Sequence, residues 1–180
     1  LGQGEPIPFA LAASEIALKQ GHLSVEGLAL RQGEFAVRTR AAFDTTASWG
    51  GELDTEGEWT LPAVLHRAEL RVKGDLDALD LRVGLQGGGT LSLDATLDRP
   101  LDAPGVSGRL GAEQLDLASF GLDAPVRMID LDLAFVWAND TLSVEGPIKI
   151  DQRALTLKLE QLAFLPQRVR VAALQLASPD

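Results

Sequence analysis

The chain contains no cysteine and no tyrosine, and only 5% of its residues are aromatic. Without cysteine, disulfides, thiolate nucleophiles and thiolate-held metals are all excluded. Only two histidines are present, His22 and His66, in different segments and without a partner at a ligand spacing. We expect both at the surface or in turns, rather than at a metal or as a catalytic base. The sequence predicts neither an enzyme nor a bound cofactor or metal.

Basic residues and long apolar runs are also scarce. The 16 Lys and Arg residues face 26 Asp and Glu residues, which gives a net charge of −10. Nucleic-acid binding needs clustered Lys and Arg, so a nucleic-acid partner is not expected. No apolar run approaches the ~20 residues of a membrane-spanning helix. The chain has no methionine at its start and stops at Asp180 after a strand-like run, and its only methionine is Met128. We therefore expect a fragment of a longer protein, whose anchor or targeting segment lies outside it.

Motifs for catalysis or phosphate binding are missing too. There is no Gly-x-Ser-x-Gly, and Gly87-Gly88-Gly89 has neither the Gly-Lys-Ser/Thr sequence nor the following helix of a phosphate loop. Asp130 and Asp132 form an Asp-x-Asp pair, which in other settings binds Ca²⁺ or does acid–base work. Here they alternate with leucines, so they should lie on the solvated side of a strand.

What the chain does have is alternation of apolar and polar residues. The pattern Leu-Ser-Val-Glu-Gly at 23–27 returns letter for letter at 142–146, with looser copies at 53–57 and 70–74. A period of two residues predicts a half-buried strand, and the closing glycine predicts a bulge, a bend or a strand end. After Gly27 the alternation of apolar and polar residues shifts by one position, so we expect a bulge there.

The whole pattern predicts an all-β domain over residues 1–180, with residues 1–14 loose or irregular. About ten to thirteen short strands joined by short turns favour an antiparallel meander. Residues 79–97 predict a hairpin that turns at Gly87-Gly88-Gly89, and residues 115–120 favour a helical turn. Each strand has one apolar face that needs cover. A half-open groove, a β-sandwich and a closed barrel all satisfy that need.

Several motifs resemble the TamB/AsmA-like family of bacterial envelope proteins. They are Pro104-Gly105-Val106-Ser107-Gly108-Arg109-Leu110, then Gln114-Leu115-Asp116-Leu117, Asp130-Leu131-Asp132-Leu133, and Leu142-Ser143-Val144-Glu145-Gly146-Pro147-Ile148. The resemblance implies a long sheet curled into a β-taco with an apolar interior. It also implies a periplasmic location, an N-terminal inner-membrane helix outside this fragment, and a role in moving phospholipid between the inner and outer membranes.

Two functional hypotheses follow. In the first, the fragment is part of an apolar groove for phospholipid acyl chains, lined by Leu79, Leu81, Val83, Leu85, Leu91, Leu93, Leu97, Ile129, Leu131, Leu133, Phe135, Trp137, Leu142, Val144, Leu155, Leu157 and Leu159. In the second, it is a scaffold for outer-membrane protein assembly. A free edge strand would then pair with a partner, such as a TamA-like outer-membrane barrel, by β-augmentation.

Overall fold

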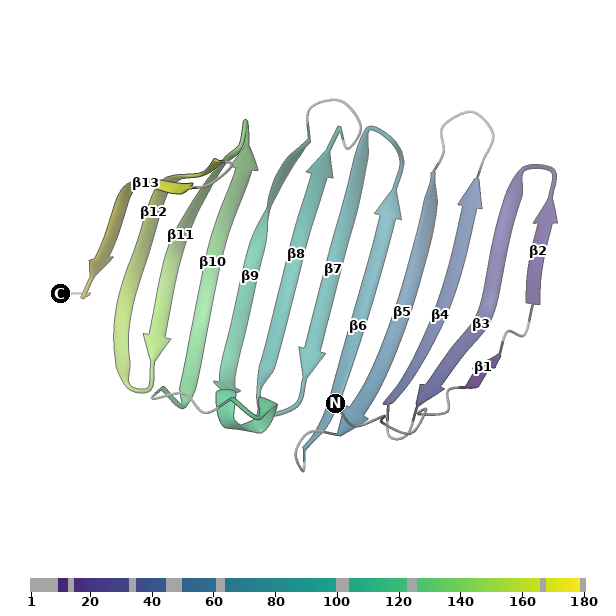
Figure 1. Ribbon diagram of the computed structural model, residues 1–180, viewed down its shortest axis with the longest axis horizontal. Helices are drawn as coiled ribbons and strands as arrows, with labels where there is room; N and C mark the ends of the chain where they lie inside the picture. Colours follow the sequence, from purple (N-terminus) through teal and green to yellow (C-terminus); the bar gives the residue numbers. More distant parts are fainter. Residues whose placement is uncertain are drawn as a thin grey trace, which may run out of the picture.

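The computed structural model describes residues 10–12, 15–32, 35–44, 50–60, 64–99, 104–122, 126–165 and 168–178. Within these residues, thirteen strands form one antiparallel sheet, accompanied by one short 3₁₀ helix, η1 (Leu117–Phe120) (Figure 1). The strands are β1 Ala10–Ala12, β2 Glu15–Lys19, β3 His22–Gln32, β4 Phe35–Asp44, β5 Gly51–Thr60, β6 Leu65–Gly74, β7 Ala78–Gln86, β8 Thr90–Asp98, β9 Gly105–Asp116, β10 Met128–Ala138, β11 Thr141–Ile150, β12 Arg153–Leu165 and β13 Arg168–Ala177.

The strand order confirms the predicted meander. From β3 to β13 each strand pairs with its neighbour in sequence, while β1 and β2 both pair with β3. The two ends of the sheet do not meet, and no second sheet packs on the first among the described residues. The fold is therefore a single curled, half-open sheet, and neither a sandwich nor a closed barrel. Of the segment predicted to be loose, β1 is a short strand, whereas residues 1–9 and 13–14 lie outside the described part.

The local predictions at the hairpin and the helical turn are confirmed. β7 and β8 pair from Leu79 with Leu97 to Leu85 with Leu91, and the three glycines make the turn. η1 begins after Asp116, whose side chain accepts a hydrogen bond from the Ala118 amide at 3.0 Å. Such an N-cap satisfies an amide that the helix itself leaves without a partner.

The predicted bulge is present at Gly27. The pairing of β3 with β4 shifts register between Val25 and Leu28, and Gly27 has φ of +64°. One extra residue on a strand returns the following side chains to the same face. Leu28 consequently lies on the face that already holds Val25.

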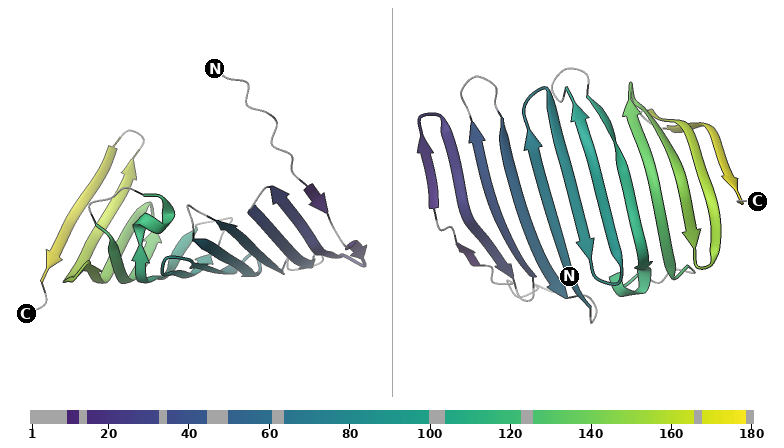
Figure 2. Two further views of the ribbon diagram at one scale, coloured as in Figure 1. Left: turned by 90° about the horizontal axis from the view of Figure 1, so that it is seen from below. Right: turned by 180° about the vertical axis from the view of Figure 1, so that it is seen from behind.

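The sheet curls toward the side that carries η1. Seen from below in Figure 2, β12 and β13 at one end and β3 and β4 at the other rise out of the plane of the central strands. η1 lies on that same, inner side. Strand twist accumulates across a sheet, so an open sheet of this width is not flat.

The described part of the chain forms no closed hydrophobic core. Among the described residues, only three apolar side chains are buried: Ala95, Ala112 and Leu133. The chain exposes 12965 Å² to solvent, whereas a compact protein of 19.2 kDa exposes about 8,400 Å². The excess is what a one-layer sheet should expose, because neither face is covered by a second layer.

Candidate functional site: the apolar face

The strand register gathers the alternating apolar residues onto one face, which we call the apolar face. One row of paired residues crosses the sheet through Val25, Ala41, Leu53, Val72, Leu81, Ala95, Gly108, Phe135, Val144, Leu159 and Leu174. A parallel row includes Leu70, Val83, Leu93, Leu110 and Leu133. All the residues that we predicted to line a groove share this face.

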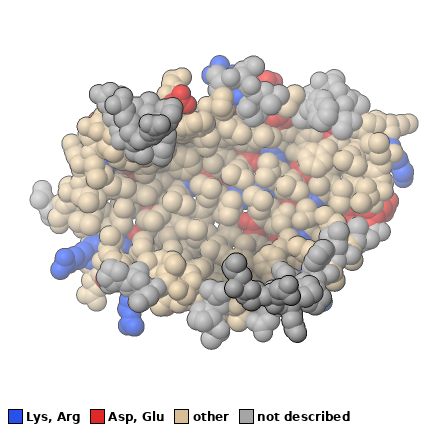
Figure 3. All heavy atoms as spheres, in the orientation of Figure 1, with Lys and Arg blue, Asp and Glu red and all other residues tan. Residues whose placement is uncertain are grey.

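The apolar face is the inner, concave side. His66 lies on this face, because it alternates along β6 with Ala68 and Leu70. Its Nε2 lies 3.1 Å from the Ser119 carbonyl oxygen of η1. Figure 3 views this face and shows mainly uncharged atoms, with charged residues protruding at its margins and a few red and blue atoms visible within its right half. The sheet therefore curls around its apolar side chains.

The size of this face suits hydrocarbon chains. Neighbouring strands lie ~4.8 Å apart, so the twelve-strand path is ~53 Å wide. Four successive apolar positions on one strand span ~20 Å. One acyl chain accounts for about half of the ~30 Å hydrocarbon core of a bilayer, or ~15 Å. The face exceeds that length in both directions.

The side chains of the apolar face lie opposite one another in the strand pairing and remain accessible to solvent. Most are half-buried, and toward the ends of the sheet exposure rises to 65% at Ile16 and 59% at Leu174. A continuous exposed apolar surface of this kind marks a site of interaction.

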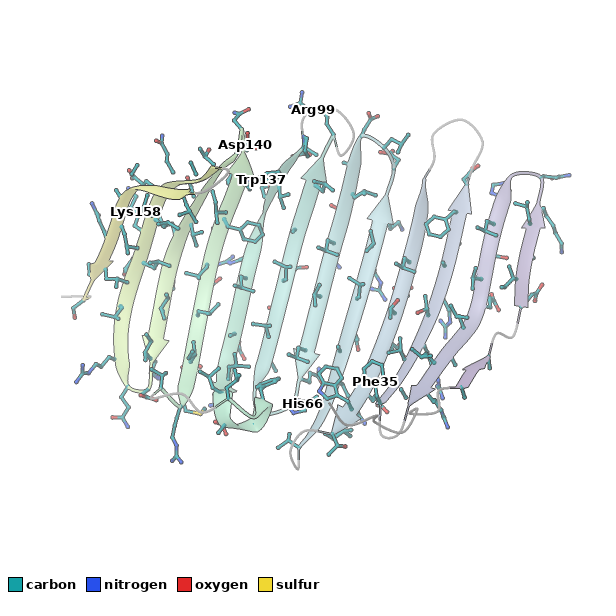
Figure 4. The ribbon with its side chains drawn as sticks, in the orientation of Figure 1. Phe35, His66, Arg99, Trp137, Asp140 and Lys158 are labelled. Carbon is teal, nitrogen blue, oxygen red and sulfur yellow. The ribbon has the colours of Figure 1, made fainter. Side chains whose placement is uncertain are left out.

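An aromatic cluster bounds this face at one end of the strands (Figure 4). Ring centroids are 6.5 Å apart for Phe35 and Trp59, 5.5 Å for Trp59 and His66, and 4.6 Å for His66 and Phe120. His66 is fully buried, so the prediction of a surface histidine is wrong for it. His22, in contrast, is a surface residue as predicted, with its side chain 66% exposed beside Asp44.

The three-glycine turn packs against this cluster. A Cβ atom at Gly87 would lie 2.5 Å from His66 Nδ1, and one at Gly88 would overlap the Ser119 side chain. The glycines thus let the β7–β8 turn approach η1 closely.

The opposite, polar face carries ion pairs between neighbouring strands. Arg71 Nε lies 2.6 Å from Asp54, Arg82 Nε lies 3.2 Å from Asp94, and Arg109 donates two hydrogen bonds to Asp132. The hydrogen bond from Arg109 lowers the pKa of the Asp132 carboxyl. This pairing agrees with the expected solvated role of the Asp-x-Asp motif.

A hollow of about 690 Å³ lies on the polar face, over β8–β12. Its lining includes Arg109 with Asp132 and Lys149 with Asp130, which are already ion-paired. We therefore place the candidate site on the apolar face. Within the described ranges there is no group of three or more potential metal-ligating residues, and no helix is long and apolar enough to span a bilayer.

One charged residue on the apolar face escaped the sequence reasoning. Arg153 pairs with Ile150 and shares the alternation of Leu155, Leu157 and Leu159. Arg127 lies two residues before Ile129, at the same end of the strands. The signal was present in the sequence, because Arg153 falls on the same period as the leucines that follow it.

No family model matches the chain, and neither a curated protein nor a solved structure matches it significantly.

Proposed function

We propose that this chain is a segment of a periplasmic conduit that carries phospholipid acyl chains between the inner and outer membranes on its apolar face. The observation that supports it is the uncovered, concave apolar surface that continues across the sheet from β3 to β13. Burying each methylene of a lipid chain stabilises a complex by ~0.8 kcal/mol, so such a surface holds hydrocarbon without polar recognition. The resemblance to the TamB/AsmA-like family supports the same function.

The geometry favours sliding over a fixed pocket. Neighbouring rows present similar aliphatic side chains, so an acyl chain displaced by one strand spacing meets nearly the same surface. Cofactors and catalytic groups have no part in such movement.

The test is lipid recovered with the purified protein. Mass spectrometry of the extracted protein should identify phospholipid, and Leu131→Asp should lower the bound amount at least about fivefold, because it puts a carboxylate among the chains. Ala134→Asp adds the same charge to the same strand, but on the exposed polar face. It should retain the lipid. Absence of lipid from the wild type, or equal losses in both variants, would refute the proposal.

A second candidate, a β-augmentation scaffold, is supported by the edge strand β13. Its apolar residues Val171, Leu174 and Leu176 are 47–60% exposed, and residues 168–177 contain no proline that would protect the edge. Successive backbone amides on a strand point to opposite sides. Of the two substitutions Ala172→Pro and Ala173→Pro, one therefore removes an amide that points away from β12 and could donate a hydrogen bond to a partner strand. If that variant alone loses a TamA-like barrel partner while lipid binding stays intact, the scaffold is favoured over the conduit.

A further inference from the structure

The apolar face is not symmetric in charge along the strands. Among the strand residues whose side chains are described, Arg153 is the one charged residue that the register puts on this face. It closes the row formed by Leu115, Ile129 and Ile150, at the end of the strands where η1 lies. A guanidinium at the margin of a hydrocarbon surface is the arrangement that an amphipathic ligand requires.

A second guanidinium belongs to the same corner. The Arg127 carbonyl oxygen accepts a hydrogen bond from the Leu117 amide at 3.1 Å. The Arg127 amide donates one to Asp151 Oδ1 at 3.2 Å. These two bonds fix the backbone of Arg127 between η1 and the β11–β12 turn. Arg127 directly precedes β10, and Arg153 begins β12, two strand spacings or ~10 Å away.

Both side chains are available to a ligand. Arg127 and Arg153 are exposed, and neither forms a salt bridge within the described residues. Asp151 is the carboxylate nearest in sequence to Arg153, and its Oδ1 accepts hydrogen bonds from the Arg127 and Met128 amides. It is therefore engaged with the backbone of the corner.

The other end of the central strands is more acidic. The β6–β7, β8–β9 and β10–β11 connections there carry Asp75, Asp77, Asp98 and Asp140, against Arg99, whereas Lys19 and Arg168 lie at the same end on the outer strands β2 and β13. An anionic group on a lipid lying on the apolar face would be repelled at that end and attracted at the η1 end.

We infer that Arg127 and Arg153 bind the anionic phosphodiester headgroup of a lipid whose acyl chains lie on the adjoining apolar face. This inference rests on the proposed function and adds to it a headgroup position and a preference for phospholipid over uncharged lipid. Guanidinium groups suit the task because they donate paired, charge-assisted hydrogen bonds to phosphate oxygens.

The experiment compares two lipids with identical acyl chains, phosphatidylglycerol and diacylglycerol, in retention by the purified protein after incubation with vesicles. The wild type should retain more phosphatidylglycerol. The double variant Arg127→Gln/Arg153→Gln should lose that preference, roughly three- to tenfold, and keep its diacylglycerol. Inorganic phosphate at millimolar concentration should not displace the phospholipid, because it has no chains.

The matched control is Arg31→Gln/Arg99→Gln, which removes the same charge from the polar face and the opposite margin. It should retain the preference. Equal retention of the two lipids by the wild type, or an equal loss of phosphatidylglycerol in both double variants, would overturn the inference. If neither lipid is retained, the proposed conduit itself fails, and this outcome is distinct from the other two.

Discussion

Glycine serves different purposes at different positions of this sheet. Gly27 has a positive φ and lies at a register shift, as the repeat pattern predicted. Gly57 closes a similar pattern, but it lies in continuous register inside β5. The prediction of a bulge, bend or strand end is wrong for Gly57. The missing side chain there leaves the apolar face thinner, and the path of the backbone is unchanged.

Gly88 provides a test at the residue scale. It has φ of +63°, and a Cβ there would overlap the Ser119 side chain of η1. Gly88→Ala should lower the free energy of unfolding by about 1–3 kcal/mol, measured by urea denaturation, through backbone strain and displacement of η1. A Cβ on Gly84, in β7, meets nothing within 4 Å. Gly84→Ala should change stability by less than about 0.5 kcal/mol; equal effects would contradict the packing argument.

His66 shows why one residue was mispredicted. The sequence around it offers only a histidine at the start of a strand, and that setting is usually exposed. Its burial comes from Trp59 on the neighbouring strand and from Ser119 and Phe120, more than 50 residues along the chain. No local pattern encodes a contact over that separation. Arg153 is the opposite case, since its place followed from the alternation alone.

At the scale of elements, the strands and tight turns were predictable because both are local. Alternation fixes which residues share a face, and short connections leave adjacent antiparallel pairing as the simple solution. The half-open curl was one of three alternatives that the sequence left open, because the twist and curvature of a sheet are the sum of small contributions from all its strands. The position of η1 over one end of the apolar face was not predictable for the same reason.

The element η1 should be held mainly by its aromatic neighbours. It has a single turn, which is too short to be stable by its own hydrogen bonds. His66→Ala removes both the ring between Trp59 and Phe120 and the contact with the Ser119 carbonyl. Hydrogen exchange of the Gly121 and Leu122 amides, which bond back to η1, should accelerate at least about tenfold.

His22→Ala is the matched control for this prediction. His22 is exposed on β3, far along its strand from the aromatic cluster. The substitution should leave exchange at Gly121 and Leu122 unchanged. Acceleration throughout the sheet in His66→Ala would mean global destabilisation, and would contradict a role confined to η1.

At the scale of the whole molecule, stability and function depend on the same uncovered surface. Each inner strand is held by backbone pairing and by contacts with two neighbours along the sheet, and in the described part only η1, at one end, packs above the apolar face. The apolar surface that a second layer would otherwise bury remains open to a ligand. A bound lipid should therefore stabilise the fold, because it binds the native state alone.

The one-layer architecture predicts a small dependence of stability on denaturant. An unfolded chain of 19.2 kDa exposes about 27,800 Å², so folding to 12965 Å² buries about 14,900 Å². A compact protein of the same mass would bury about 19,400 Å². The urea m value scales with this buried area. For the lipid-free protein it should be about three quarters of that for a compact all-β domain of 180 residues. An m value equal to that of the compact domain would mean that the sheet folds shut over its apolar face in solution, and that the face is not open to lipid.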